Sequence, residues 1–169
     1  MAARYPARVW LALLTIYVVW GSTFIALAIT VRDLPPLLSM AIRHLTAGAL
    51  LLAWALPRGA REGDRIGTPQ VLAGFVFGGL LFLLGHGSLA WAQKTVPAGV
   101  AALLVGSIPR WMALLDRVVL GKRLRSSAYV GFALGFVGLA FLIDPFGSGS
   151  AARVGALVII LGALAWSAG

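Results

Sequence analysis

The sequence predicts an all-α membrane protein, a polytopic bundle of transmembrane helices, on three observations. Hydrophobic residues make up 60% of the 169 residues, and the mean hydropathy is +0.96. Charged residues make up only 11%, too few to cover a soluble fold of this size with polar side chains. The apolar residues also fall into runs of about 20, the length that a helix needs to cross a bilayer. The lipid bilayer is therefore predicted to surround most of the chain.

Five complete apolar runs are bounded by charged residues, Pro or Gly, and a sixth run begins before the last residue. The predicted spans are 9–30, 36–56, 71–92, 98–120 and 128–143. The sixth run starts near Val154 and reaches Gly169, which makes it marginal in length for a span. The first run could instead be a cleaved secretory signal, but it is longer than the roughly 7 to 15 apolar residues of such signals. We therefore prefer an uncleaved first span.

The basic residues alternate between the two sides of the predicted bundle. Cytoplasmic loops retain Lys and Arg, so the richer side is predicted to be cytoplasmic, together with the N-terminus. The poorer side, with the loops around Asp33, Lys94 and Asp144, is predicted to face outward and holds Arg32, Lys94 and Arg153. The richer side holds Arg4, Arg8, Arg58, Arg61, Arg65, Arg117, Lys122, Arg123 and Arg125. The localisation that follows is the inner, or plasma, membrane, with several crossings.

Several classes of function are disfavoured by the same residues. The net charge of +9 lies in short gaps between apolar runs and forms no basic face with interleaved aromatic residues, so we expect no nucleic-acid partner. The chain has no cysteine, which removes disulfides, thiolate metal sites and cysteine nucleophiles. Two histidines without a carboxylate in the membrane make a metal site improbable. We therefore expect no metal, no cofactor and no catalytic residue.

An odd number of spans leaves the chain on the side opposite to its start, so that any repeat of the unit would be inverted. Placing Trp166 on Trp20 aligns residues 154–169 with residues 8–23 at an offset of 146. Apart from the tryptophan, the aligned residues are mostly small and aliphatic. Inverted repeats of this kind recur in secondary transporters.

Four stretches resemble the EamA-type branch of the drug/metabolite transporter superfamily. They are Trp20-Gly21-Ser22-Thr23-Phe24, MAIRHLTAGALLL around Arg43, AWAQKTVPAGVAALLVGSIPRWMALLDRVVLGKRLR from Ala90 to Arg125, and GFALGFVGLAFL from Gly131 to Leu142. The resemblance covers nearly the whole chain, and its specificity lies in the order and spacing of the pieces. It implies a ten-helix exporter of amino acids, other small metabolites or toxic compounds, built from two inverted five-helix repeats.

On this resemblance, residues 1–145 are the first five-helix repeat, and residues 146–169 are an outer loop followed by the truncated first helix of a second repeat. The partner of the chain is then a second five-helix repeat, either a missing C-terminal half or another protomer. Three residues depart from the family pattern. Lys122 stands where Glu is usual, Arg110 follows the proline of the fourth helix where an apolar or aromatic residue is usual, and His86 replaces a common Asn.

Polar side chains within the spans are expensive in hydrocarbon and commonly face a cavity or a partner. Counting 1.5 Å per helical residue places Thr23, Arg43, His44 and His86 in one layer, about 10 Å below the outer surface. Arg43 would offer a fixed positive charge to an anionic group, and a histidine there could titrate near neutral pH. The alternatives are that Arg43 snorkels or holds helix-end carbonyls, and that each histidine makes one interhelical hydrogen bond.

A second group of candidates lies around the proline of the fourth span. Pro109 removes a backbone hydrogen bond and frees a carbonyl that Ser107 or a substrate could use, while Arg110 either faces the path or snorkels. Trp20 lies near the middle of the first span, where it could line the path. The predicted substrate-path residues are thus Trp20, Thr23, Arg43, His86, Ser107, Pro109 and Arg110.

Glycines at helical spacing are assigned to helix packing, because small residues let two helices approach closely. These residues are Gly74, Gly78, Gly131, Gly135 and Gly138.

Three functions remain in competition. The first is a secondary transporter half or fragment that exports amino acids or other small metabolites by alternating access between two repeats. The second is an intramembrane hydrolase, for which Ser88 and Ser107 are only unspecific nucleophiles. The third is a small helical protein that acts as a dimer or an accessory subunit. We favour the first, with a small-molecule substrate whose identity, coupling ion and direction the sequence leaves open.

Overall fold

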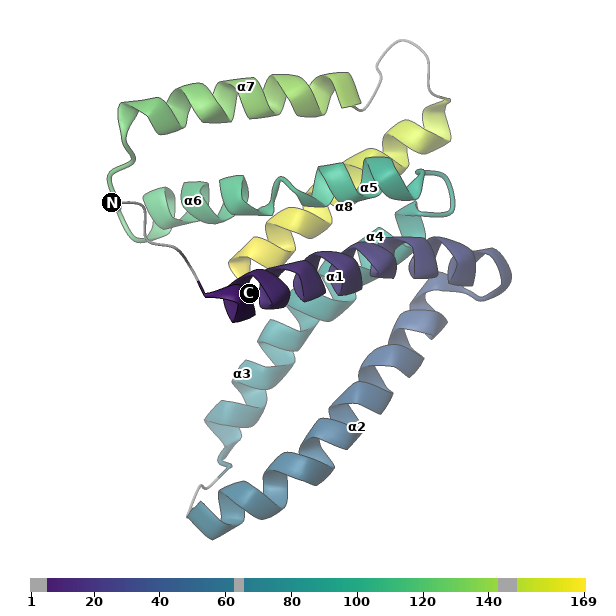
Figure 1. The fold of residues 1–169 in the computed structure, drawn as a ribbon, viewed down its shortest axis with the longest axis vertical. Helices are drawn as coiled ribbons and strands as arrows, with labels where there is room; N and C mark the ends of the chain where they lie inside the picture. The colour runs from purple at the N-terminus through teal and green to yellow at the C-terminus, as the bar shows by residue number, and fades with distance from the viewer. Residues whose placement is uncertain (1–5, 63–65, 143–148) are drawn as a thin grey trace.

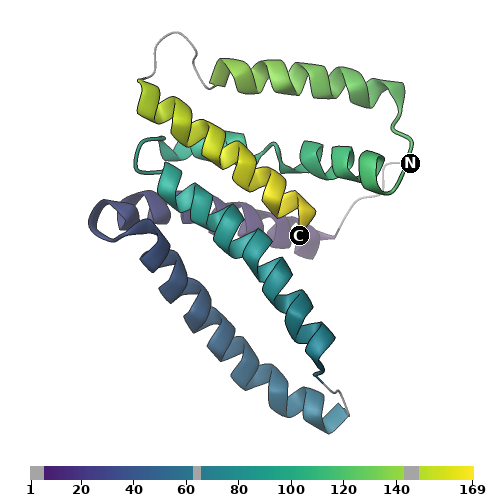
Figure 2. The same ribbon diagram turned by 180° about the vertical axis from the view of Figure 1, so that it is seen from behind.

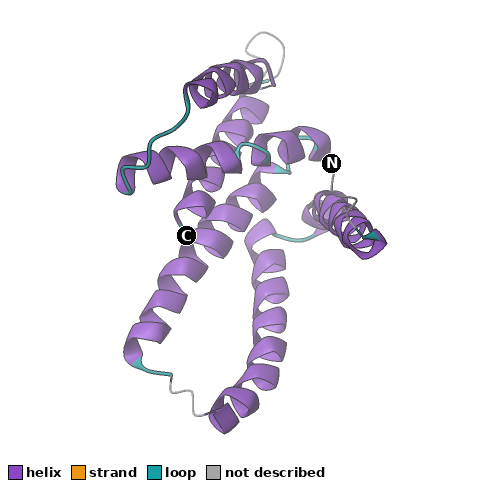
Figure 3. Ribbon diagram, turned by 60° about the vertical axis from the view of Figure 1, so that its left-hand side comes forward, coloured by secondary structure: helices purple, strands orange, loops and turns teal. Residues whose placement is uncertain are grey.

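The computed structural model describes residues 6–62, 66–142 and 149–169, and helices account for nearly all of them (Figure 3). No strand occurs among these residues, so the predicted all-α class is confirmed. The predicted loop residues Arg4, Arg65 and Asp144, and Ile143 at the end of the predicted fifth span, lie outside the described residues. The helices are α1 (Ala7–Asp33), α2 (Pro36–Glu62), α3 (Thr68–Gly78), η1 (Gly79–His86), α4 (Gly87–Ala92), α5 (Ala98–Val105), α6 (Ile108–Val119), α7 (Ser126–Leu142) and α8 (Ser150–Ala168).

Five helical segments in the described residues are long and apolar enough to cross a membrane, as a polytopic bundle requires. The first four agree with the predicted spans to within a few residues at each end, apart from the second, whose helix α2 continues past Pro57 to Glu62. The segments are Ala7–Asp33, Pro36–Gly59, Thr68–Ala92, Ala98–Val119 and Ser150–Ala168.

The last two helices compare differently with the sequence prediction. The run expected to be the fifth span, 128–143, forms α7, whose 17 described residues reach about 26 Å. The sixth run, expected to be marginal and to start near Val154, forms the 19-residue helix α8. It begins at Ser150, because the backbone of Gly149 is extended and helical geometry starts with the next residue. The first turn, Ser150 to Arg153, consists of polar and small residues.

Two of the spans are irregular where their sequences weaken an α-helix. The third span passes through the π-helical segment η1, in which Gly79 and Gly85 occur. The fourth span breaks between α5 and α6 at Gly106 and Ser107, just before Pro109, whose nitrogen cannot donate a hydrogen bond. The Ser107 amide instead donates to the Leu104 carbonyl in a tightened turn.

Helix α8 runs through the centre of the bundle, across α4, η1, α5 and α6 (Figures 1 and 2). Its first turn meets the α4–α5 connection, where the Thr95 hydroxyl donates to the Ala151 carbonyl at 3.2 Å. The Gln93 amide beside that connection donates to the Phe24 carbonyl in the second half of α1. Since α8 begins at the level where α1 is ending, the two helices run in opposite directions.

The buried core is small and lies around these contacts. It joins residues of α1, α4, α5 and α8, among them Leu27, Leu89, Leu104 and Ile159. Most large apolar side chains lie on the outside, such as Tyr17 at 70% exposure on α1. In water such a surface would aggregate, whereas in a bilayer it contacts lipid.

A central cavity as the candidate functional site

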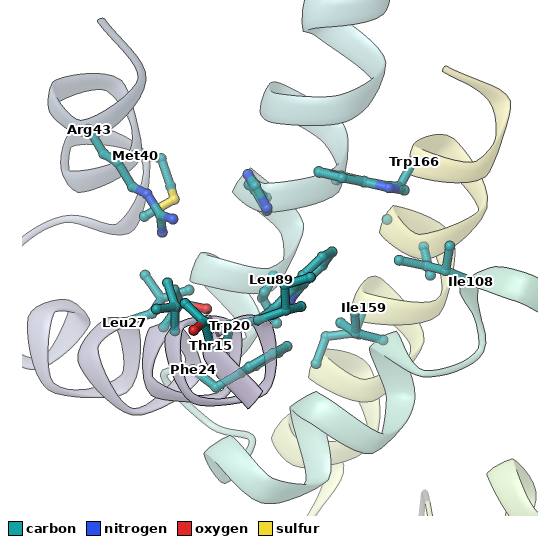
Figure 4. Close-up of a pocket in the computed structure, with 18 residues that line it drawn as sticks. Thr15, Trp20, Phe24, Leu27, Met40, Arg43, Leu89, Ile108, Ile159 and Trp166 are labelled. Atoms are coloured by element: carbon teal, nitrogen blue, oxygen red, sulfur yellow. Dashed lines mark hydrogen bonds between the residues drawn. The ribbon is translucent and has the colours of Figure 1, made fainter. Parts of the chain in front are cut away.

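A cavity of about 430 Å³ opens between α1, α2, η1 and α8 at the middle of the bundle (Figure 4). Its volume is in the range of small-molecule sites. Trp20, the central residue of the 27-residue helix α1, lines it, and Trp166 of α8 lines it from a different part of the chain. Between them lie apolar side chains, including Phe24, Leu89 and Ile159.

An aromatic cluster closes the side of the cavity between α2, η1 and α8. The rings of His86 and Trp166 have centroids 4.7 Å apart, and Phe82 and His44 have centroids 4.4 Å apart. His44 and His86 stack within 4° of parallel, and His86 Nδ1 lies 3.2 Å from His44 Nε2. One of these nitrogens donates and the other accepts, so the pair ties α2 to η1 by one interhelical hydrogen bond. His86 therefore makes the interhelical bond and also lines the cavity.

Arg43 reaches the cavity from α2, on the side that faces α1. Figure 4 shows Arg43 and Met40 pointing from α2 toward the space above Leu27 of α1. No hydrogen bond or ion pair joins the Arg43 guanidinium to any residue that the structure describes. The alternative in which Arg43 holds helix-end carbonyls is thus not seen in the described part of the chain.

Two threonines of α1 add polar atoms to an otherwise apolar wall. Thr15 donates its hydroxyl proton to the Leu11 carbonyl at 2.8 Å, and Thr23 donates to the Trp20 carbonyl at 2.6 Å. Each hydroxyl therefore offers only its acceptor side to the cavity. Thr23, Arg43 and His86, which the sequence placed in one layer, line the same cavity, and His44 adjoins it through His86.

The residues around the proline of the fourth span do not line this cavity, and their place on a substrate path stays a prediction. Ser107 is fully buried, and its hydroxyl oxygen accepts a hydrogen bond from Trp111 Nε1 at 3.1 Å. Arg110 turns to the opposite side, where its Nη1 donates to the Gly106 carbonyl and its side chain lies against Gly135 of α7. Pro109 is exposed, and Ile108 takes the place in the cavity wall.

The break between α5 and α6 explains this difference. An uninterrupted helix would carry Ser107 and Arg110 along one face. The tightened turn at Gly106 and Ser107 instead changes the direction in which the side chains of α6 point. A proline in a span signals such a break, yet its angle depends on the neighbouring helices.

The predicted path residues include none from α8, which the sequence indicates only as a truncated helix. In the structure, the cavity is lined on this side by Ile159, Gly162 and Trp166. One signal was available, because the offset of 146 residues had already placed Trp166 in the position equivalent to Trp20.

Close helix packing is found at glycines other than those predicted. A Cβ on Gly162 of α8 would lie 2.7 Å from Ser88 Cβ, and a Cβ on Gly155 would lie 2.7 Å from Val96 Cγ2. Of the predicted packing glycines, Gly135 alone meets a neighbour, the Arg110 side chain. The others would carry a Cβ with no described atom within 4 Å, and they are Gly74, Gly78, Gly131 and Gly138. The predicted close approach is therefore not made at these four within the described chain.

A second cavity of about 770 Å³ lies between the end of α1 and residues 93–98. Arg32 and Lys94 line it, and none of its described lining residues is acidic. A deeply buried amide, Gln93, separates it from the core. Both charged side chains in its described wall are therefore basic.

This arrangement defines a class of protein, a multi-pass membrane protein with a small-molecule cavity at the centre of its spans. The described residues hold no group of three or more His, Cys, Asp or Glu side chains with the spacing of a metal site. The cavity wall holds aromatic rings, one guanidinium and one imidazole, a set suited to binding a solute.

The chain belongs to the EamA-like transporter family, whose sequence profile matches residues 8–144. This finding confirms the resemblance drawn from the sequence motifs and the expectation of a multi-pass membrane protein. The match reaches from the start of α1 to just beyond the described end of α7.

The curated relatives are named as transporters, not as enzymes. "Uncharacterized inner membrane transporter YedA" of Escherichia coli (strain K12) is 33% identical over 159 residues, covering 94% of this chain and 50% of that protein. "Uncharacterized transporter YoaV" of Bacillus subtilis (strain 168) is 24% identical, covering 94% and 54%. A "Probable amino-acid metabolite efflux pump" of Escherichia coli (strain K12) is 25% identical, covering 94% and 50%.

The chain thus spans about half the length of the curated relatives that it matches. Its localisation in the inner membrane follows from the family, its spans and these relatives. No solved structure is significantly similar to the chain.

Proposed function

We propose that the chain forms one half of a secondary transporter that exports amino acids or other small metabolites by alternating access. The observation that carries the proposal is the central cavity, which is walled on one side by α1 and on the other by the oppositely directed α8. In transporters built from inverted repeats, the substrate site lies near the middle of the membrane, where the two repeats meet.

The domain division follows the same logic. Residues 1–145 are proposed to be the first five-helix repeat, and residues 146–169 lead into the first helix of a second repeat. Supporting this division are the profile match to residues 8–144 and the coverage of about half of each relative. The equivalent places of Trp20 and Trp166 in the cavity wall fit an inverted pair of helices, α1 and α8.

The second repeat is proposed to pack on those faces of the bundle that have no neighbour in the described chain. Gly74 and Gly78 on one flank, and Gly131 and Gly138 on another, face open space in the described chain. Small residues at these spacings permit close helix contacts in membranes. The first check is to read the coding sequence after the codon for Gly169, where we expect about five further apolar runs that continue the repeat.

Export is proposed on the name of one relative, the probable amino-acid metabolite efflux pump. The direct test loads cells that express the protein with radiolabelled amino acids and follows their release. We expect faster release of at least one labelled compound than from cells with an empty vector. We expect Trp20→Ala to reduce the release rate, because Trp20 lines the cavity at the middle of α1.

Trp10→Ala is the matched control in this assay. Trp10 stands on the same helix as Trp20, is 62% exposed and does not line the cavity, so its loss should leave release unchanged. Equal release from vector, wild-type and Trp20→Ala cells for every labelled compound would contradict transport by the protein.

A further inference from the structure

We propose that the substrate is an apolar organic anion, a molecule with a hydrophobic or aromatic body and one carboxylate, and that Arg43 binds the carboxylate. The inference rests on the proposed transport function for its physiological meaning, but the binding claim itself can be tested separately. It is carried by the charge, the hydrogen bonding and the shape of the cavity wall.

The first step of the argument is the balance of charge within the cavity. Among its 18 lining residues, Arg43 is the one with a permanent charge, and none is acidic. A solute whose single charge is an amine would meet a like charge and no carboxylate among the described lining residues, which is costly in an apolar setting. A carboxylate would meet a guanidinium that presents several N–H donors in a planar fork.

The second step is the state of Arg43 in the described chain. Its backbone lies within a span, about 10 Å from the N-terminal end of α2, and the described residues give its guanidinium no hydrogen-bond acceptor or counter-ion. The acidic residues of the described cavity-lining helices, Asp33, Glu62 and Asp116, lie in the last turns of their helices, and Asp116 pairs with Lys122 at 2.7 Å. A charged group in a span usually has a partner. Here the space beside the guanidinium, where a partner could bind, lies inside the cavity.

The third step is the shape and polarity of the remaining wall. Trp20 and Phe24 of α1 and Trp166 of α8 surround the cavity with aromatic faces, and the threonine hydroxyls are engaged by their own helix. Figure 4 shows Arg43 on one side of the cavity and Trp166 on the other. A molecule with a charged end and an apolar end matches this division, with its carboxylate at Arg43 and its body toward Trp166.

The test uses the purified chain in neutral-lipid nanodiscs and three probes of nearly the same size: phenylacetate, phenylacetamide and phenethylamine. Binding is measured by equilibrium dialysis of the radiolabelled compounds. Phenylacetate is expected to bind more tightly than either of the others. Arg43→Gln is expected to weaken phenylacetate binding about tenfold to hundredfold, as loss of a charged hydrogen bond does, and to leave phenylacetamide binding unchanged.

Two further variants test whether the loss of phenylacetate binding is specific to the side chain at position 43. Arg43→Lys retains the charge but lacks the planar fork of donors, so it should bind phenylacetate more tightly than Arg43→Gln and less tightly than the wild type. Arg58→Gln removes a charge from the same helix at a site away from the cavity, where Arg58 donates to the Trp54 carbonyl and stacks on its ring. It should bind phenylacetate as the wild type does.

A lipid phosphate is the other anion that could meet Arg43, so the dialysis is repeated in nanodiscs that contain phosphatidylglycerol. Unchanged phenylacetate binding there supports the solute as the ligand, and its loss would assign Arg43 to lipid. The proposal is overturned if phenylacetate fails to bind, if phenethylamine binds equally well, or if Arg43→Gln has no effect.

The outcomes separate this inference from the transport proposal. Binding of phenylacetate that depends on Arg43, without release of any labelled compound from cells, would keep the site and refute transport. Release of a cationic or neutral compound that is insensitive to Arg43→Gln would keep transport and refute the anionic substrate.

Discussion

Helices α7 and α8 are both apolar, similar in length and rich in glycine, yet they occupy opposite environments. α8 buries Gly155, Ala156, Ile159, Gly162 and Ala163 at the centre of the bundle. In α7 only Leu139 is buried among the described residues, and the helix lies at the edge of the molecule (Figure 1). Hydropathy is therefore no guide to burial inside a membrane protein, because lipid and protein interior are equally apolar.

The difference lies in what faces each helix. The buried residues of α8 recur at steps of three and four and make one continuous face. On this face, Gly162 lies against Ser88 and the Leu84 carbonyl of the third span. α7 offers glycines at the same steps, but its described neighbours are the long side chains of Arg110 and Trp111. Close packing between helices requires small residues on at least one face and a matching surface opposite.

The largest expected effect comes from Gly162→Val on α8. The new Cβ would lie 2.7 Å from Ser88 Cβ and 3.1 Å from the Leu84 carbonyl oxygen, which belongs to backbone and cannot turn aside. We expect the free energy of unfolding to fall by about 1–3 kcal/mol, the usual cost of overpacking. The measurement is unfolding in dodecyl sulfate mixed micelles followed by circular dichroism.

Gly138→Val on α7 is the control for that comparison, since no described atom lies within 4 Å of its Cβ position. It should change the free energy of unfolding by less than about 0.5 kcal/mol. Equal losses for the two variants would mean that α7 and α8 are packed alike.

A smaller effect is expected from Gly135→Val, the close contact of α7. The new side chain would meet the Arg110 guanidinium group, which can swing to another rotamer at the cost of its hydrogen bond to the Gly106 carbonyl. We expect a loss of about 1 kcal/mol or less in the same unfolding assay. Gly131→Val, which meets nothing within 4 Å, is the reference, and a loss as large as that of Gly162→Val would refute the distinction between movable and fixed neighbours.

A hydrogen bond near α8 should contribute less than close packing does. His44 and His86 form one interhelical bond beside Trp166, and we expect a coupling of about 0.6 kcal/mol between His44→Phe and His86→Phe in a double-mutant cycle. Phenylalanine keeps an aromatic ring at each position, so the cycle reports mainly on the bond. A coupling near zero would show that the 3.2 Å contact contributes nothing to stability.

The smallest effect is expected at the connection that leads into α7. Lys122 pairs with Asp116 at 2.7 Å, but the two side chains are 59% and 44% exposed, so water screens the pair. We expect Lys122→Gln to leave the unfolding midpoint unchanged within error. A clear destabilisation would mean that this ion pair anchors α7 and that the helix is held more firmly than its packing indicates.

Most of the helical spans could be predicted from the sequence, because crossing a bilayer requires about 20 apolar residues in a row. The sequence also indicates candidate residues within the spans, because polar side chains there commonly face a cavity or a partner. The structure places four of them in the cavity wall: Trp20, Thr23, Arg43 and His86. Ser107, Pro109 and Arg110 were singled out by the same logic, but the break between α5 and α6 turned them elsewhere.

The sequence by itself determined the class of this protein, its membrane setting and its family, since these depend on composition, run length and motif order. Only the tertiary structure decided which helices touch. It placed α8 in the centre and α7 at the edge, brought His44 beside His86, and set Trp166 across the cavity from α1. The physical reason is that helix rotation and contact depend on steric fit between side-chain surfaces far apart in sequence, and hydrophobic periodicity carries no record of that fit when lipid is the solvent.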